Sequence, residues 1–514
     1  MTLALLAAVL PACWWTANPG PAAFDVAAAP VAPVGVVASG PITYVQVTIA
    51  AGTAREPAGQ QGVAWLTAHL LRQGGAGERS PAEVDALLDE LGTDIEVIVD
   101  RELVTLRARA LHEDTAVLGE LLVDMLLRPQ LDPDAFGRIR DGQVDHLERG
   151  VLSSDEELGL TVLETWAFEG HPYGSPLRGR SGALPSLGLD DVRRFLADRY
   201  VRSAVTLGMA GPAVRADGRI DAGQPGGAGL VALRDALSSL PPRLSEGTTP
   251  RRLPAISGRD LLVVEKPTGS TGIHFGHTLD LDRNHADWPA LVLAFTALGE
   301  HRQSHGRLYR ALRGERGLNY GDYAYVEVHR QAGWSATRET GTARRQNLFH
   351  VWLRPTTPAN GPFALKAAVG MVEAFVSDGL SPEEFVRTRD YLRGRVALWA
   401  DHPGRRLGWA VEASALGMPD PVAALPDALE QLRLEDVNGA IRRHIRPDDL
   451  RIVVVTQDAQ AFVDAVQGDA ATPITYAGAP PDDDAPQRAE DVAWSQLDLG
   501  LDRARTIGTD GLLR

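Results

Sequence analysis

One histidine on an amphipathic segment is the first group in this 514-residue chain that could take part in metal chemistry. His69 lies in residues 62–75, where apolar residues recur at Val63, Leu66, Leu70 and Leu71 before a glycine pair. This spacing predicts a helix that ends at the glycines, after a strand over 44–51 and a polar turn. A catalytic zinc needs three protein ligands and a carboxylate that accepts the proton of the bound water. His69 alone supplies only one of these ligands and no carboxylate.

The sequence of this stretch resembles the N-terminal region of the pitrilysin/insulinase family of metallopeptidases, the inverzincins. In that family a helix carries H-x-x-E-H within a frame close to G-x-A-H-x-x-E-H-x-L-x-x-G. In the same frame Trp65 stands at the first histidine, Ala68 at the glutamate and His69 at the second histidine. An indole N–H only donates hydrogen bonds, and a methyl group accepts no proton. The resemblance therefore implies a degenerate zinc site.

The family's third zinc ligand is a glutamate on a later helix, and the corresponding position here is His146. Imidazole binds zinc, so His69 and His146 could form a site with two ligands. Two ligands without a general base do not make a peptidase. The plainer alternative is that His69 is a packed or hydrogen-bonded remnant and that Trp65 fills part of the metal position. We expect this chain to bind no metal cofactor.

Two further histidine sets could be taken for a metal site. One is His274 with His277, and the other is His277 with His285. The segment around His274 has the pattern of a strand, and the resemblance places His277 and His285 where the family carries histidines without metal. We expect neither set to bind a metal.

The second half of the chain carries a pair of residues suited to oxyanion chemistry. The run from Gly306 to Tyr320, Gly-Arg-Leu-Tyr-Arg-Ala-Leu-Arg-Gly-Glu-Arg-Gly-Leu-Asn-Tyr, resembles the same family closely. The resemblance implies that Arg313 and Tyr320 bind the substrate carbonyl and stabilise the oxyanion, as a cation and a phenol donor can. The structural alternative is that Arg313 is one of several arginines on a solvated helix and that Tyr320 packs at a strand edge.

Composition excludes several classes of function. Hydrophobic residues make up 44% and charged residues 23% of the chain, which is ordinary for a globular protein. The net charge of −16 without a basic stripe argues against nucleic acid as a partner. The single cysteine, Cys13, excludes an internal disulfide and a cysteine-based zinc site.

The position of Cys13 predicts where the protein is located in the cell. A short apolar run over residues 3–10 precedes Leu10-Pro11-Ala12-Cys13, which resembles the lipobox of bacterial lipoproteins. We expect residues 1–35 to be a signal and tether, with lipidation at Cys13 and a place in the periplasm or cell envelope. Any membrane contact would then come through the lipid anchor, because no other segment is apolar over enough residues to span a bilayer.

Two echoes in the sequence predict a duplicated unit. Ser381-Pro382-x-x-Phe385-x-Arg387-x-Arg389-Asp390 repeats a pattern that starts at Asp132-Pro133, and Leu434-Glu435-Asp436-Val437 repeats Leu189-Asp190-Asp191-Val192. We expect an α+β fold of two homologous halves that face each other across a cleft, each a mostly antiparallel sheet with helices packed on it. The expected divisions are an N-terminal half over 36–212, a linker over 213–258, a C-terminal half over 259–470 and a loosely packed tail over 471–514.

The resemblance extends to some bacterial family members that work as heterodimers, in which one chain holds zinc and the other holds only the Arg/Tyr pair. The sequence matches the second kind, with a zinc-bearing partner that has an intact H-x-x-E-H motif and with peptides as substrates. A structural or peptide-binding scaffold without a peptidase role is the first alternative. A divergent zinc metalloendopeptidase with rearranged ligands is the second.

Overall fold

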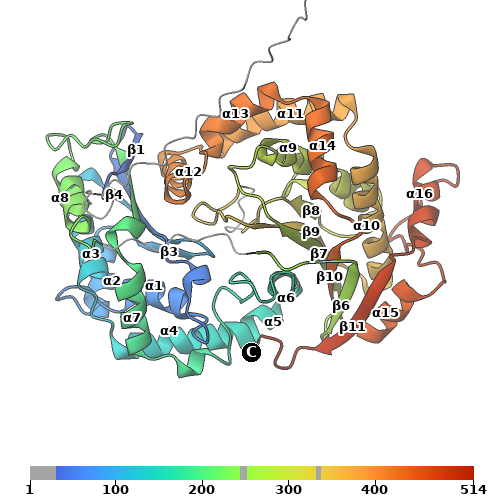
Figure 1. Ribbon diagram of the computed structural model, residues 1–514, viewed down its shortest axis with the longest axis horizontal. Coiled ribbons are helices and arrows are strands. Elements are labelled where there is room, and N and C mark those ends of the chain that lie inside the picture. The colour runs from blue at the N-terminus through green and yellow to red at the C-terminus, as the bar shows by residue number, and fades with distance from the viewer. Residues whose placement is uncertain (1–30, 243–251, 331–336, 514) are drawn as a thin grey trace, which may run out of the picture.

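The computed structural model describes residues 31–242, 252–330 and 337–513. They form two mixed sheets, one in each half of the sequence, with helices packed around both (Figure 1). The expected α+β class is confirmed. Cys13 and most of the expected signal and tether lie outside the described residues. Within the described ranges, each helix is too short or too polar to cross a membrane.

The first sheet has the strand order β1-β5-β2-β4-β3. Neighbouring strands are antiparallel except for β1 and β5, which run parallel. Because side chains alternate along a strand, Val45 and Leu106 reach the core on one face while Arg107 and Arg109 point to the other. The strands are β1 (Val34–Val37), β2 (Ile42–Ile49), β3 (Glu96–Val99), β4 (Val104–Leu111) and β5 (Val205–Gly211).

The helices of the first half begin where the sequence supplies caps. Ser80 and Glu83 form a capping box ahead of a proline, and the side chains of Asp132 and Ser154 accept hydrogen bonds from the first turns of their helices. The helices are α1 (Val63–Gln73), α2 (Pro81–Glu90), α3 (Thr115–Leu127), α4 (Pro133–Asp145), α5 (Val151–Ser153), α6 (Asp155–Ala167), α7 (Leu189–Arg199) and α8 (Gly227–Leu237).

The second sheet repeats the first. Its order is β11-β6-β10-β7-β9-β8, and without β11 this matches the first sheet strand for strand, including a parallel pair, β6 and β10. The duplication read from the sequence echoes is thus present in the topology. The strands are β6 (Arg259–Glu265), β7 (Thr271–Leu279), β8 (Asp322–Tyr325), β9 (Asn347–Thr356), β10 (Leu450–Thr456) and β11 (Leu501–Gly508).

The helices of the second half follow the same plan. Helix α11 corresponds to α4, and α14 leads into β10 as α7 leads into β5. The helices are α9 (Trp288–Gly299), α10 (Gly361–Asp378), α11 (Pro382–Leu398), α12 (Pro403–Leu416), α13 (Pro421–Gln431), α14 (Leu434–His444), α15 (Ala459–Gln467) and α16 (Pro486–Ser495).

The halves exchange one helix each. Helix α12 of the second half packs on β1, β2 and β5 of the first sheet, and α6 of the first half packs on β7, β9 and β10 of the second (Figure 1). Both contacts are close enough to need glycine. A Cβ on Gly208 in β5 would lie 2.2 Å from Val411 Cγ2, and one on Gly159 in α6 would lie 2.4 Å from His274 Cδ2. The exchange fixes how the halves sit against each other.

Buried ion pairs join the halves. Arg344 of the second half donates to Asp100 at 2.7 Å and to Glu164 of α6 at 2.9 Å, and all three side chains are almost fully buried. Burial alone would raise the pKa of Asp100, but Arg330 and Arg344 outweigh it and lower that pKa to about 2. A buried network of this kind is costly to break, because the remaining charge would stay uncompensated.

The expectation of a loosely packed tail over 471–514 is wrong. Strand β11 adds to the edge of β6 in parallel register, and Asp491 of α16 accepts a 2.7 Å hydrogen bond from the buried Arg316. The Asp- and Pro-rich composition of the tail suggested loose packing, and its contacts could not be predicted because their partners are distant in sequence. The stretch expected as a linker also contains a helix, α8, which packs on α3.

Candidate functional site

Helix α1 presents the expected degenerate positions on one face. Trp65 and His69 lie one turn apart, and their rings stack with centroids 3.7 Å apart. Burial, and to a smaller extent the nearby Arg178 cation, lower the pKa of His69 to about 4, so the imidazole is neutral at pH 7. Ala68 is fully buried in the hydrophobic core. This face holds one stacked imidazole and no carboxylate.

The start of α1 is held by a half-buried carboxylate. Glu56 Oε1 accepts hydrogen bonds from the backbone N–H of Gly62 and of Ala64, each at 2.9 Å. These bonds satisfy donors that a helix N-terminus otherwise leaves free. Burial raises the pKa of Glu56 to about 8, against these bonds and Arg101, which lower it.

His146 begins a π-helical turn, His146–Gly150, that continues α4. Its Nε2 lies 3.0 Å from Oε1 of Glu157, whose pKa is lowered chiefly by this hydrogen bond. π-helical turns occur often at functional positions. Here the turn gives the third-ligand position a carboxylate partner.

Arg178 stands beside the stacked pair. Its guanidinium carbon lies 4.8 Å from the centroid of the Trp65 ring, which is within the range of a cation–π contact. Its pKa is lowered by burial, while Glu157 acts in the opposite direction. Sequence reasoning missed this residue, since the family frame covers α1 and the later helix but not the loop that carries Arg178.

Trp65, His69, His146 and Arg178 all line one cavity of about 670 Å³ between the two halves. Six of the chain's 13 histidines line it, four of them from the second half. His274 Nδ1 lies 3.0 Å from His350 Nε2, and His301 Nδ1 lies 2.7 Å from the Tyr325 hydroxyl. No sequence motif predicts this cluster of histidines, because His301, His329 and His350 match no spaced pattern.

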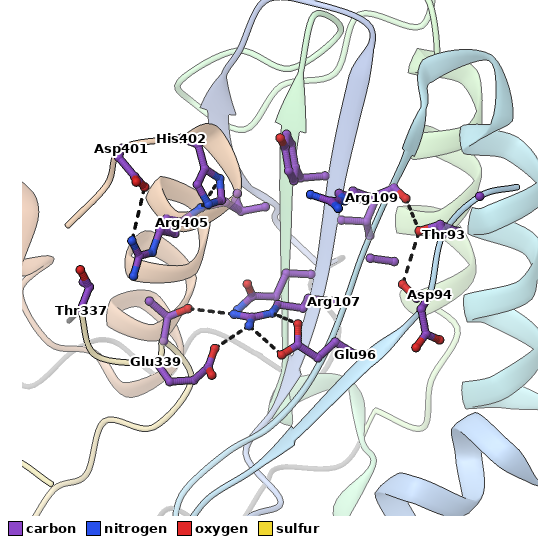
Figure 2. A pocket seen from close by; sticks show the side chains of 18 of the residues that line it. Thr93, Asp94, Glu96, Arg107, Arg109, Thr337, Glu339, Asp401, His402 and Arg405 are labelled. Atoms are coloured by element: carbon purple, nitrogen blue, oxygen red, sulfur yellow. Dashed lines mark hydrogen bonds and ion pairs between the residues drawn. The ribbon is translucent and has the colours of Figure 1, made fainter. Parts of the chain in front are cut away.

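A second cavity, of about 880 Å³, adjoins the first and is shown in Figure 2. Glu96 and Glu339 line both cavities, and Arg107 pairs with both carboxylates, which joins β3 to the second half. Arg109 faces the second cavity from the next outward position of β4 (Figure 2).

Arg313 and Tyr320 are brought together away from these cavities. The Arg313 guanidinium carbon lies 5.9 Å from the Tyr320 ring centroid, and Arg313 donates to the Tyr309 hydroxyl. Arg313 belongs to the other π-helical turn, Tyr309–Gly314. Tyr320 is 75% exposed, more than any other large apolar or aromatic residue among those described. Neither residue lines the cavity of Trp65 and His69.

Two of the neighbouring arginines have structural partners, which the alternative of a solvated helix does not predict. Arg307 pairs with Glu384 of α11, and Arg316 is buried against Asp491 and Glu490. The loop before Tyr320 is held by Asn319, whose amide donates to Asp322 at 2.6 Å and to the Arg354 carbonyl at 3.1 Å. The Arg313/Tyr320 pair therefore stands on a fixed loop with its ring in solvent.

A family model described as Insulinase (Peptidase family M16) matches residues 37–181. The match contains α1 with Trp65, Ala68 and His69, and it extends past His146. This chain carries an insulinase-family domain.

Curated relatives agree with this family. Mitochondrial-processing peptidase subunit beta of Lentinula edodes is 25% identical over 163 residues, 32% of this chain and 34% of that protein, so the chain matches only about a third of that relative. An uncharacterized zinc protease of Bacillus subtilis is 19% identical over 404 residues, 78% of this chain and 90% of that protein. One of Streptomyces coelicolor is 24% identical over 419 residues, 78% of this chain and 79% of that protein.

Solved structures share the fold. A peptidase M16 inactive domain from Pseudomonas fluorescens superposes with a TM-score of 0.68 at 20% identity, over 82% of this chain and 94% of that one. A protease from Helicobacter pylori gives 0.68 at 15% identity, over 82% and 96%. These likenesses establish the two-sheet architecture.

The zinc of insulinase-family peptidases does not fit the residues of α1. Trp65 offers no ligand atom, Ala68 no base, and the guanidinium of Arg178 places a positive charge where a cation would have to bind. His69 is the remaining ligand type on this helix, and it is stacked under the indole. The helix lacks the chemistry of the family's metal site.

The other histidine sets are engaged in hydrogen bonds. His277 Nδ1 lies 3.1 Å from the Thr278 carbonyl, and its Nε2 accepts from the Arg446 N–H at 3.1 Å, which leaves it no ring nitrogen for a metal. His285 faces His444 and Asp287 rather than His277. The Asp287 carboxylate is already bound by Arg443 and by His444 at 2.7–3.0 Å.

Proposed function

We propose that the chain is a zinc-free subunit of an insulinase-type peptidase and that Arg313 and Tyr320 complete the active site of a partner. The observation that carries this is their placement. The Tyr320 ring is 75% exposed beside the Arg313 guanidinium, outside the chain's own cavity, while α1 lacks a metal site. A phenol and a cation displayed together on the surface are suited to an oxyanion that another chain generates.

The partner is a family member with an intact H-x-x-E-H motif, which supplies zinc and the general base, and the substrates are peptides. This chain contributes no metal and binds no nucleic acid. A lipid anchor at Cys13 would place the complex in the periplasm or cell envelope.

The test is the turnover of an unstructured peptide by the reconstituted pair. Arg313→Ala should lower kcat by about 10²–10³, the usual cost of losing one oxyanion donor. Tyr320→Phe, which removes only the hydroxyl, should act in the same direction. The matched control is Arg310→Ala, because Arg310 is an exposed neighbour three residues earlier. Co-purification must be unchanged in all three variants, and equal turnover for Arg313→Ala and Arg310→Ala would refute the proposal.

A structural subunit without a peptidase role is the second candidate. It is favoured by similarity to cytochrome b-c1 complex subunit 1 of Caenorhabditis elegans, 24% identical over 173 residues, 33% of this chain and 36% of that protein. This candidate would be supported if the complex with Arg313→Ala forms with full stability and its peptide turnover is unchanged. A divergent zinc peptidase would instead show one tightly held zinc per chain by elemental analysis, and peptide cleavage without any partner.

A further inference from the structure

The loop that carries Arg178 holds it in a fixed place. The Arg178 carbonyl accepts a hydrogen bond from Gln143 Nε2 at 2.8 Å. Gly179 has φ of +93°, and a Cβ there would lie 2.4 Å from the Gln61 carbonyl oxygen, so the loop packs directly on the segment before α1. The backbone that carries the guanidinium is therefore held against the segment before α1.

The Arg178 guanidinium has no hydrogen bond or ion pair with any residue in the described part of the chain. The other arginines that line the same cavity are paired. Arg101 donates to Glu164 at 3.0 Å, and Arg330 pairs with Asp100 at 2.8 Å. Arg178 is thus a half-buried cation that lines the cavity without a hydrogen-bonded or ion-paired partner, and an anionic ligand can pair with it there.

Each carboxylate that lines the cavity already has a partner. Glu157 lies 3.0 Å from His146, and Glu156 accepts from Arg354 at 3.0 Å. Glu96 and Glu339 share Arg107, and Glu164 takes Arg101 and Arg344. None of them lies within ion-pair distance of Arg178, so the anion for this site has to come from outside the described chain.

We propose that the site formed by Arg178 and Trp65, where the family's motif would hold a metal, binds a carboxylate. A guanidinium matches a carboxylate with two parallel N–H···O bonds, and the indole holds its plane in one orientation. Apolar side chains line the same cavity beside it: Leu147, Val151, Leu160 and Leu177. The ligand is therefore a carboxylate on an apolar group, as at the C-terminus of a peptide that ends in leucine.

The same chemistry could come from an aspartate side chain within a peptide, and three fluorescent peptides separate these sources. The first ends in a free leucine carboxylate and contains no acidic residue. The second is its C-terminal amide, and the third is the amide with one internal Asp. Fluorescence anisotropy with the isolated full-length chain measures each affinity. This assay involves neither Arg313 nor a partner, so its result is independent of the proposed function.

The chain should bind the free-acid peptide at least about 10-fold more tightly than the amide, as expected for a charge-assisted pair away from bulk water. Arg178→Met should remove this preference, and Arg178→Lys should keep part of it. Arg109→Met is the matched control, because Arg109 lines the adjoining cavity and also has no side-chain partner among the described residues (Figure 2). It should leave the preference unchanged.

Tight binding of the third peptide but not the second would assign the site to an acidic side chain instead of a C-terminus. Equal affinity for the acid and both amides, a preference that survives in Arg178→Met, or no binding of any peptide at millimolar concentration would each overturn the proposal. Glu157→Gln gives an independent check, because it removes the negative charge that acts on Arg178 from a distance. The free-acid peptide should bind this variant more tightly than the wild type, and weaker binding would count against the proposal.

Discussion

At the scale of single residues, Trp65 and Ala68 decide the chemistry of the site, because they stand where the family's motif has a zinc ligand and a general base. Trp65 removes a nitrogen ligand and adds a large flat ring that contacts both His69 and Arg178. The indole keeps the imidazole away from water, and Arg178 adds a positive charge nearby, so both favour the neutral form of His69. His69 is therefore held uncharged by its surroundings.

This predicts how His69 titrates. In NMR spectra of the chain labelled with ¹³C-histidine, its pKa should lie near 4. Trp65→Ala should move it toward the ordinary value of about 6.5, because burial is the larger cause. Arg178→Gln should raise it less. A His69 pKa above 6 in the wild type would contradict the stacked, dry environment described here.

At the scale of elements, the exchange of α6 and α12 holds the two halves together. Each helix reaches the opposite sheet at a position where a glycine leaves room, Gly159 for α6 and Gly208 for α12. Leu407 and Val411 of α12 bury their side chains against Ala210 of β5. Together with the buried ion pairs of Arg344, these two contacts join the halves on either side of the cavity.

Gly208→Ala should destabilise the chain by about 1–3 kcal/mol, because the new methyl group overlaps Val411 and over-packs the contact. Chemical denaturation monitored by circular dichroism measures this. The control is Gly142→Ala in α4, where a Cβ meets nothing within 4 Å. That change should instead stabilise the helix by about 0.5–1 kcal/mol. Equal stability of the two variants would show that α12 does not pack on β5.

At the scale of the whole molecule, buried titratable groups gather between and beside the halves. Burial lowers the pKa of seven histidines, to about 4 for His69, His277, His301 and His350. It also raises the pKa of three carboxyls, Glu56 and Asp322 to about 8 and Glu300 above its usual range. The histidines are His69, His274, His277, His301, His305, His329 and His350.

These shifts predict a stability optimum. Below pH 6.5 the unfolded chain binds protons on histidines that the folded chain keeps neutral, so stability falls as the pH drops toward 4. The three carboxyls act oppositely, because their folded forms keep a proton that the unfolded chain loses as the pH rises above about 4. Seven histidines outweigh three carboxyls below pH 6.5, and between pH 6.5 and 8 only the carboxyls change the stability. The free energy of unfolding should peak near pH 6.5, and a curve that is flat from pH 4.5 to 6.5 would contradict this.

Much of the local structure followed from the sequence. The apolar spacing from Val63 to Leu71 acts within a few turns, so it predicted α1 correctly. The capping box at Ser80 and the proline after Asp132 start α2 and α4 through equally local contacts. The family frame likewise located Trp65, Ala68 and His69, and it paired Arg313 with Tyr320, whose side chains are in fact neighbours.

Contacts between residues distant in the sequence could not be read in this way. Asp491 and Arg316 are 175 positions apart, so no local pattern reveals their contact, and the prediction of a loosely packed tail is wrong. Arg178 lies in a loop without a motif, and only folding places it over Trp65.

The sequence by itself determined the duplicated α+β plan, the residues that stand in place of the family's zinc motif on α1 and the presence of the Arg313/Tyr320 pair, because these depend on residue identity and short spacing. The tertiary structure decided which groups share a space. It placed Arg178 and six histidines around one cavity and left Tyr320 in solvent. Whether a charge is paired or a ring is buried depends on packing between distant segments, and the order of residues along the chain does not encode that directly.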